Sequence, residues 1–392
     1  MNLPPPASKP LIYLDHGATT PLDPQAAEAM LPYLRGGCGN PSSLHRPGRE
    51  ARLALENARS CLAGLLNARE SEIYFVSGGT EADNLAIQGA AFKNRHKGQH
   101  IITTAVEHPA VLNTCKYLEK QGFEVAYLAV DEYGQVNPET VRSAIRRDTI
   151  LLSVMHGNNE VGTLNPLAEI GKIAREAGVY FHSDAVQSFG KIPLDVQALP
   201  VDLLSISGHK IYGPGGIGAL YIRRGVALEK LLHGGRQEGD KRAGTENLPG
   251  VIGLAKAAEL ICRSREEQSR RVGELRDYFQ EQLLRQFPGI RVNGHPQERL
   301  YNNLNVSFPG CDSETLLLSL DMQGIAASSG SACSAGSIEP SRVLKAMGLP
   351  AAISRSAIRF TLGKDNTREE IDYVLESLRE IVPRLQNIIQ KV

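Results

Sequence analysis

Short apolar runs alternate with longer amphipathic segments along the N-terminal two-thirds of the chain. Short apolar runs bounded by turn residues are typical of buried strands, and a period near 3.6 is typical of helices. Strands are expected at Ile73–Val76, His100–Thr104, Glu124–Ala129, Thr149–Met155, Val179–His182, Leu203–Ser207 and Ala219–Ile222. Helices are expected at Glu81–Asn94, Val111–Gln121, Pro138–Ile145 and Leu167–Ala177. This alternation predicts an α/β fold, with a mostly parallel seven-stranded sheet wrapped by helices.

The pattern changes after residue 247. The segment from Leu248 to Arg285 is predicted as one continuous helix that bridges to a second domain. Beyond it, strands are expected at Tyr301–Phe308 and Ile358–Leu362, and helices at Ser313–Met322, Glu339–Met347 and Arg368–Ile389. We therefore expect a large domain of residues 17–262 and a smaller α/β domain of residues 1–16 and 263–392.

Composition excludes several classes of protein. A chain of 392 residues is long enough for two domains, and its 43 basic residues balance 43 acidic ones. Proteins that bind nucleic acids or anionic membranes carry an excess of basic residues, so neither is expected as a partner of this chain. No apolar run approaches the roughly 18 residues of a membrane span. The N-terminal residues lack the pattern of a secretory or transit peptide, which predicts a cytoplasmic protein.

Six cysteines are scattered along the chain without a Cys-x-x-Cys pair. That spacing fits neither a disulfide framework nor a zinc site, so no metal is expected. Cys115 lies in a helical pattern and is expected to be a core thiol. Cys333 lies in a run of small residues, Ser328–Ser337, where a thiol is either reactive or incidental.

Two strand ends carry the first candidate chemistry. The strand that ends at Ser207 is followed by Gly-His-Lys, and Asp184 follows the strand before it. Burial favours the neutral, nucleophilic form of a lysine such as Lys210. Pyridoxal phosphate needs a lysine that forms an imine and an aspartate that keeps its ring nitrogen protonated. Lys210 and Asp184 fit these roles, although Asp and Lys at strand ends also form plain ion pairs.

The phosphate of such a cofactor needs backbone amides and hydroxyls at the start of a helix. Gly78, Gly79 and Thr80 follow a predicted strand and precede a helix, whose first amides attract an anion. Taken by itself, this stretch would more readily be interpreted as an ordinary glycine turn with a threonine cap.

The remaining groups also follow predicted strands. His108 lies where a partner for the cofactor ring is needed, although a lone histidine there is often a capping residue. Asn159 and Gln187 are placed to donate hydrogen bonds to the ring's phenolic oxygen. Because open α/β sheets bind ligands at the carboxyl ends of their strands, these groups are expected to converge.

The motifs resemble those of cysteine desulfurases of the NifS/IscS type, within the class V (fold-type I) aminotransferase superfamily. The resemblance covers almost the whole chain, and the Ser-Gly-His-Lys and Ser-Ser-Gly-Ser-Ala-Cys elements are its most specific parts. The motifs are Tyr13–Pro21, Asn40–His45, Ser77–Asn84, Glu107–His108, His156–Glu160, Asp184–Gln187, Ser207–Pro214, Arg242–Thr245, Ser328–Cys333 and Arg355–Phe360.

The resemblance implies a role for each candidate residue. Lys210 would bind the cofactor as an imine, Asp184 would hold the ring nitrogen, and His108 would stack on the ring and move protons. Asn159 and Gln187 would lie at the ring's oxygen edge. The phosphate would be held by Gly79, Thr80, Ser207 and His209, joined by Thr245 from the other subunit of a homodimer. Arg359 would bind the substrate carboxylate, and Cys333 would accept sulfur.

The implied activity is the removal of sulfur from L-cysteine, which gives L-alanine and a persulfide on Cys333. The sulfur would pass to an acceptor protein, either an iron–sulfur scaffold or a SufE-like shuttle, for cluster assembly or thiolation. Two alternatives stay open at this point. One is an aminotransferase or C–S lyase that uses the same cofactor without a protein persulfide, and the other is a non-enzymatic scaffold.

Overall fold

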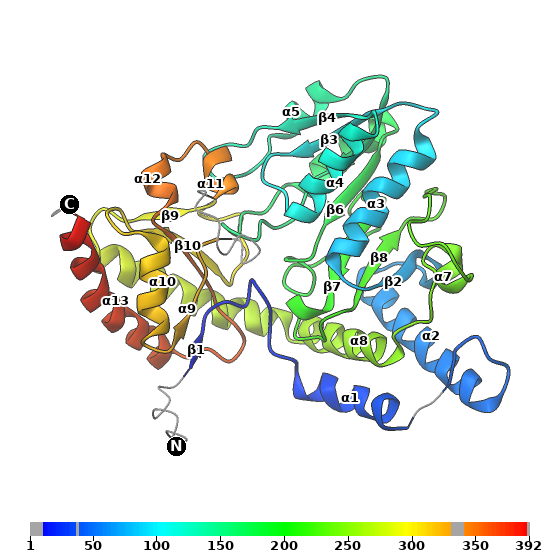
Figure 1. The fold of residues 1–392 in the computed structure, drawn as a ribbon, viewed down its shortest axis with the longest axis horizontal. Helices are drawn as coiled ribbons and strands as arrows, with labels where there is room; N and C mark the ends of the chain where they lie inside the picture. Colours follow the sequence, from blue (N-terminus) through cyan, green and yellow to red (C-terminus); the bar gives the residue numbers. More distant parts are fainter. Residues whose placement is uncertain (1–10, 37–38, 331–340, 390–392) are drawn as a thin grey trace, which may run out of the picture.

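A seven-stranded sheet forms the centre of the larger part of the molecule (Figure 1). The structure is a computed structural model that describes residues 11–36, 39–330 and 341–389. In sheet order its strands are β2 (Ile73–Val76), β8 (Gly218–Ile222), β7 (Leu203–Ser207), β6 (Tyr180–Asp184), β5 (Thr149–Ser153), β3 (His100–Thr104) and β4 (Glu124–Leu128). β8 is antiparallel to both of its neighbours, and the other neighbouring pairs are parallel. The predicted mostly parallel sheet is confirmed.

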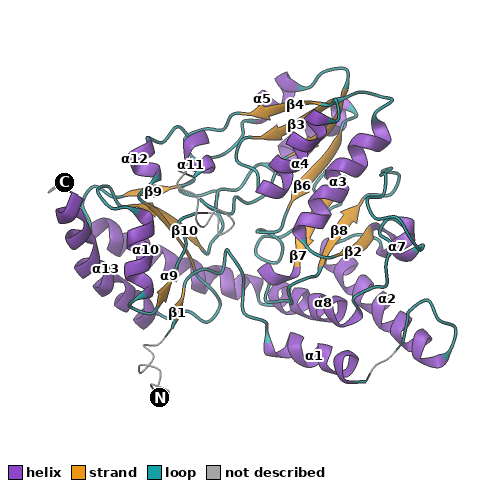
Figure 2. Ribbon diagram, in the orientation of Figure 1, coloured by secondary structure: helices purple, strands orange, loops and turns teal. Residues whose placement is uncertain are grey.

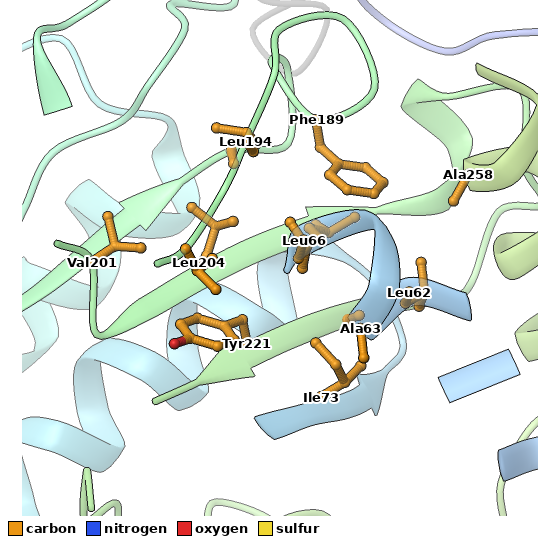
Figure 3. Packing of buried hydrophobic residues seen from close by; sticks show 14 of the residues in the cluster. Leu62, Ala63, Leu66, Ile73, Phe189, Leu194, Val201, Leu204, Tyr221 and Ala258 are labelled. Carbon is orange, nitrogen blue, oxygen red and sulfur yellow. The ribbon is translucent and has the colours of Figure 1, made fainter. Parts of the chain in front are cut away.

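Helices cover both faces of this sheet (Figure 2) because adjacent strand residues face opposite sides. Leu203 packs on one side with α3 (Gly79–Asn94) and α4 (Pro109–Lys120). Leu204 packs on the other, where Figure 3 shows it with Leu62 and Leu66 of the long helix α2. The second face is covered by α2 (Arg46–Leu66), α5 (Pro138–Ala144), α6 (Leu167–Ala177) and α8 (Leu248–Arg263), and α1 (Pro24–Arg35) packs on α8.

The C-terminal part has its own hydrophobic cluster. Its antiparallel sheet has the order β12 (Ala357–Thr361), β10 (Asn303–Ser307), β9 (Arg291–Asn293) and packs with α9 (Arg265–Gln286), α10 (Ser313–Asp321) and α13 (Arg368–Ile389). β1 (Ile12–Tyr13) runs parallel to β11 (Ile325–Ala326) and adds Ile12 to this cluster. The N-terminal segment therefore packs with the C-terminal part, as expected. The domain boundaries at 16/17 and 262/263 stay a prediction.

The predicted single helix from Leu248 to Arg285 is wrong. α8 ends at Arg263 and α9 begins at Arg265, with a break at Ser264. The Ser264 hydroxyl donates to the carbonyl of Leu260 at 2.9 Å, which is the local bond by which serine competes with helical pairing. No glycine or proline lies between Gly253 and Gly273 to mark this break in the sequence.

Other boundaries differ from prediction by a turn or less. α3 starts at Gly79, two residues early, because Gly78 takes the N-cap position with φ 155°. Glycine and threonine favour turns, so the sequence pattern places the start too late. Residues 339–340 of the predicted helix Glu339–Met347 lie outside the described residues, and α11 (Arg342–Ala346) follows them, with α12 (Ala351–Ser354) beyond.

Cys115 is fully buried, which confirms it as a core thiol, and burial raises its pKa to about 12. Within the described part of the chain, the helices are all too short or too polar to cross a bilayer.

A buried ion pair ties the edge strand β2 to its surroundings. The Arg59 guanidinium of α2 donates to both carboxylate oxygens of Glu238, at 2.9 and 2.8 Å. Glu238 lies in α7 (Gln237–Asp240) and also accepts from the backbone amide of Phe75 at 2.7 Å. One carboxylate of α7 thus joins α2 to the edge strand β2.

Replacing Glu238→Gln should lower the free energy of unfolding by about 3 kcal/mol, because it leaves the buried Arg59 charge with only the half-exposed Glu56 as an ionic partner. The double variant Arg59→Met/Glu238→Gln should lose less than the sum of the two single variants. Urea unfolding followed by circular dichroism measures both. The exposed pair Arg46–Glu50 is the control, and Arg46→Met should leave the unfolding midpoint unchanged. A Glu238→Gln midpoint equal to that control would contradict the anchoring role.

Candidate active site

A cavity of about 190 Å³ lies where the strand ends of the large sheet converge. It receives residues that follow β2, β3, β5, β6 and β7, together with Arg359 from β12 of the smaller sheet. The predicted site residues that line it are Gly79, Thr80, His108, Asn159, Asp184, Gln187, Ser207, His209, Lys210 and Arg359. The chain therefore gathers at one edge of the sheet the groups that sequence reasoning expected there.

Two predicted residues lie elsewhere. Thr245 is exposed and is not part of the lining of this cavity in the described chain, which agrees with its expected role toward a second subunit but does not test it. Cys333 lies outside the described residues.

Lys210 is held by the segment that follows β1. The lysine ends the short 3₁₀ turn η2 (Gly208–Lys210) directly after β7, and its Nζ donates to the carbonyls of Gly17 at 2.6 Å and Ala18 at 2.7 Å. Gln187 Nε2 donates to the same Gly17 carbonyl at 3.0 Å. Sequence reasoning missed Gly17 and Ala18 as lining residues, although the Asp-His-Gly-Ala motif just after a strand was a usable signal.

Asp184 contributes a buried carboxyl to the lining of the cavity. It ends β6, accepts from the Val186 amide at 2.8 Å, and is 5% exposed. Burial raises its pKa, while the nearby charges of His108 and Lys210 lower it. Burying a carboxylate is costly unless a cation or donor meets it, and a protonated pyridine nitrogen is such a partner.

Asp83 places a second carboxyl beside Asp184, which the sequence reasoning did not foresee. Its pKa lies well above the usual range because of burial and the Asp184 charge. Its Oδ1 lies 3.5 Å from His182 Nε2, and no hydrogen bond reaches that oxygen from the residues described. Two adjoining buried carboxyls make this end of the cavity suited to a protonated heterocycle.

His108 is a capping residue and also lines the cavity, while its stacking on a cofactor ring stays a prediction. It is the N-cap of α4, where its Nδ1 accepts from the Ala110 amide at 3.1 Å, and its side chain also lines the cavity. Burial lowers its pKa, and the neighbouring charges of Lys210 and Arg342 add to that effect against the opposing charge of Asp184. A neutral imidazole with one face in the cavity can stack on an aromatic ring.

The start of α3 forms the anion-binding end of the cavity. Gly78 is the N-cap and makes no side-chain cap bond, so the alternative of a threonine cap is wrong. Thr80 instead lies in the first turn of α3, and it lines the cavity together with Ser207 at the end of β7 and His209 in η2. A Cβ at position 79 would lie 2.7 Å from Val186 Cγ2, so glycine keeps this end open. First-turn amides and hydroxyls together suit a phosphate.

Arg359 is buried and firmly oriented. It is 1% exposed, and its guanidinium donates to the Asn159 carbonyl and to Asp15 Oδ1, each at 2.7 Å. Its planar fork lines the cavity between these contacts, a geometry that suits a carboxylate. Sequence reasoning missed Asp15 as the residue that orients this arginine.

These features together define a protein of the aminotransferase class-V family, whose model matches residues 12–374. The chain belongs to this family. The fold-type I architecture and the dependence on pyridoxal phosphate that its motifs predict are confirmed with it. The phosphate end, the buried carboxyls and the lysine of the cavity fit that cofactor. In the described part of the chain, no side-chain cluster suited to a metal ion occurs.

Relatives of this chain include proteins described as cysteine desulfurases. "Cysteine desulfurase IscS" of Methanosarcina thermophila is 54% identical over 96% of this chain and 93% of its own length. A solved structure described as "NIFS-LIKE PROTEIN" matches with a TM-score of 0.90 at 38% identity, over 95% of this chain and all of its own. "SspA in complex with cysteine" matches with a TM-score of 0.81 at 38% identity, over 90% of this chain and 98% of its own. The predicted cysteine desulfurase class is confirmed.

The buried Glu107 joins two of the strand ends that form the site. Sequence reasoning did not single it out as a site residue. Its carboxyl accepts from Thr104 Oγ1 at 2.7 Å and from the Met155 amide, which joins the ends of β3 and β5 next to His108. Burial raises its pKa from 4.5 to about 8. The folded protein therefore binds more protons at Glu107 than the unfolded chain does between these two values.

Because the folded-state pKa of Glu107 is raised, the wild type should lose stability relative to Glu107→Gln as the pH rises from about 5 to 8. The slope should be at most about 1.4 kcal/mol per pH unit. Urea unfolding at several pH values measures the difference. The exposed Glu281→Gln is the matched control and should track the wild type. A difference between Glu107→Gln and the wild type that does not change with pH would contradict the raised pKa.

Proposed function

We propose that this chain converts L-cysteine to L-alanine and transfers the sulfur to Cys333, where it forms a persulfide. One observation carries the proposal: the Lys210 amine, the buried Asp184 carboxyl and the Arg359 guanidinium line a single cavity. The names of the relatives, and the complex of one of them with cysteine, support the same substrate.

The substrate carboxylate would bind the Arg359 guanidinium, aided by the side chain of Asn159. Because Asp15 and the Asn159 carbonyl already orient that guanidinium, little motion is lost when the carboxylate binds. This contact would place the amino group and the Cα proton of cysteine toward Lys210.

Pyridoxal phosphate, when bound, supplies an aldehyde that forms an imine with amines and a ring that accepts the electron pair released at Cα. Thr80, Ser207, His209 and the amides of Gly79 and Thr80 would hold its phosphate. Asp184 would keep a proton on the ring nitrogen, His108 would cover one face, and Gln187 would donate to the phenolic oxygen.

Lys210 would have two tasks. It would bind the resting cofactor, and once released by substrate its Nζ would take the Cα proton. The carbonyls of Gly17 and Ala18 accept from that Nζ, so they keep the amine pointing into the cavity. A proton acceptor held at one point in this way transfers protons efficiently.

The sulfur step involves Cys333. Its thiolate would attack the substrate sulfur, so that an S–S bond forms as the substrate C–S bond breaks. The electron pair of the C–S bond stays on Cβ, which takes a proton and becomes the methyl group of alanine. The balance is L-cysteine plus the Cys333 thiol giving L-alanine plus the Cys333 persulfide, with no external oxidant or reductant.

The same proposal covers the oligomeric state of the protein, its location and its sulfur acceptor. The chain would act as a homodimer in which Thr245 of each subunit reaches the phosphate site of the other, and the exposed position of Thr245 supports this. Exposed Leu31, Leu34 and Leu53 on α1 and α2 offer apolar surface for such an interface. It would work in the cytoplasm, where thiols stay reduced. The acceptor would be an iron–sulfur scaffold or a SufE-like shuttle, serving cluster assembly or thiolation.

Replacing Lys210→Ala should abolish the cofactor's absorbance band near 400 nm (about the position expected of a lysine imine) and alanine release. The loss in turnover should be at least about 1,000-fold, since both the imine and the Cα base disappear. Absorbance spectra and alanine assays measure this. Lys172→Ala, at an exposed lysine on α6 that does not line the cavity, is the control and should keep the band. Normal alanine release by Lys210→Ala would reject the role of Lys210.

Replacing Cys333→Ser should leave the absorbance band intact and abolish persulfide and alanine formation from cysteine. Mass spectrometry after brief exposure to cysteine detects the added sulfur on the wild type. Cys311→Ser, at a buried thiol, is the control and should keep the persulfide. Full turnover of Cys333→Ser would instead favour an aminotransferase or C–S lyase, and a wild type without the band would favour a scaffold.

A further inference from the structure

A second buried lysine contacts the backbone of Lys210. Lys191 is 5% exposed and is not among the described residues that line the cavity. Its Nζ donates to the carbonyl of Gln187 at 2.8 Å and, over a longer distance of 3.5 Å, to the carbonyl of Lys210. The cavity lining includes both Gln187 and Lys210. One buried amine therefore contacts the backbones of two candidate site residues.

The side chains of the same two residues also meet at one atom. Lys210 Nζ donates to the Gly17 carbonyl at 2.6 Å, and Gln187 Nε2 donates to it at 3.0 Å. Lys191 thus closes a ring of contacts, since it holds both backbones while Gly17 accepts from both side chains. A shift of either backbone would move the Lys210 amine relative to the rest of the cavity.

The local sequence explains how Lys191 reaches these carbonyls. Gly190 has a φ of 78°, and a Cβ there would lie 2.6 Å from Ile261 Cγ2, so the turn requires glycine. The amides of Lys191 and Ile192 then donate to the Ser188 carbonyl. This tight turn brings the lysine side chain back to the carbonyl of the residue four positions earlier.

The surroundings of Lys191 make its charge costly to bury. Burial and the charge of Lys210 lower the pKa of Lys191 to about 7, and no carboxylate of the described chain opposes that shift. Next to it lies a small cavity of about 10 Å³, which has room for about one water molecule. The titratable groups that share this cavity with Lys191 are His16, Tyr212, Tyr301 and Lys364. A buried amine without a counter-ion is unfavourable for stability, and such groups are typical of functional sites.

We propose that Lys191 is a positioning residue, which fixes the backbones of Gln187 and Lys210 and so aims the Lys210 amine at the cofactor. Lys191 touches neither cofactor nor substrate in this role and acts through the two carbonyls. The inference rests on the imine-forming role of Lys210 in the proposed function, and it does not require the sulfur step.

The first test adds pyridoxal phosphate to the cofactor-free full chain and follows the band of the Lys210 imine. Lys191→Met keeps an unbranched apolar side chain and removes the amine, so imine formation should slow about tenfold. Lys172→Met, at the exposed lysine on α6, is the matched control and should react at the wild-type rate.

A second ligand separates positioning from general damage to the site. Pyridoxamine phosphate has the same ring and phosphate but carries an amine in place of the aldehyde, so it forms no imine with a lysine. Its dissociation constant for Lys191→Met should stay within about threefold of the wild-type value, because the phosphate end and Asp184 are unchanged. Isothermal titration calorimetry measures this constant.

A third measurement needs no cofactor. The pKa of Lys191 is about 7 in the folded protein against an ordinary 10.5, so between these values the unfolded chain binds more protons at this residue. The urea midpoint of the wild type should therefore rise relative to that of Lys191→Met as the pH increases from 7 to about 9. Circular dichroism follows this unfolding, and Lys172→Met should track the wild type.

Three results would overturn the inference. The first is a Lys191→Met variant that forms the imine as fast as Lys172→Met. The second is an equal loss of imine rate and of pyridoxamine phosphate affinity, which would indicate a general structural role. The third is a difference in urea midpoint that does not change with pH, which would contradict the buried amine. If Lys191→Met does not fold, Lys191→Gln, whose side chain is shorter, decides by the same criteria.

The same experiments distinguish failure of the proposed function. A wild type that forms no imine band with pyridoxal phosphate would overturn the role of Lys210 and this inference together. A wild type that forms the band but no persulfide would overturn the sulfur step alone, and the imine rates would still decide the role of Lys191.

Discussion

The burial of the Asp184 carboxyl at the end of β6 is the constraint around which the site is arranged. A carboxyl enclosed by the sheet edge, with Asp83 beside it, is stable only when a proton or a cation compensates it. The fold places a lysine and a histidine within range of its charge and leaves a cavity in front of it. A protonated ring bound in the cavity would offset the free-energy cost of burying that carboxyl.

The cavity is completed only when the two ends of the chain meet the central sheet. The N-terminal segment brings Gly17 to Lys210, and β12 brings Arg359 to Asn159. Asp15 and Arg359 are joined across most of the sequence by one ion pair of 2.7 Å. The orientations of Arg359 and Lys210 therefore depend on the same packing between the C-terminal part and the large sheet.

The sequence predicted the central sheet well because its strands are short, continuously apolar and bounded by turn residues. It predicted the positions of Lys210, Asp184 and His108 because each directly follows such a strand, and the ends of parallel strands meet at one edge. It did not predict Asp83, Asp15 or the carbonyl of Gly17, which act through contacts between residues far apart in the chain. The break at Ser264 was missed for a local reason, since a hydroxyl bond within one turn leaves no trace in a charge pattern.

The turn after β5 shows how consecutive side chains divide their tasks. The Asn158 side chain holds the turn itself, because it accepts from the amides of Glu160 and Val161 and donates to the Val106 carbonyl. Asn159 lines the cavity, and the Glu160 carboxylate accepts from the Ser341 hydroxyl at the start of α11. A shift of this turn would therefore move the cavity lining at Asn159 and the start of α11 together. Packed elements of this kind keep two distant groups in register more reliably than two separate loops would.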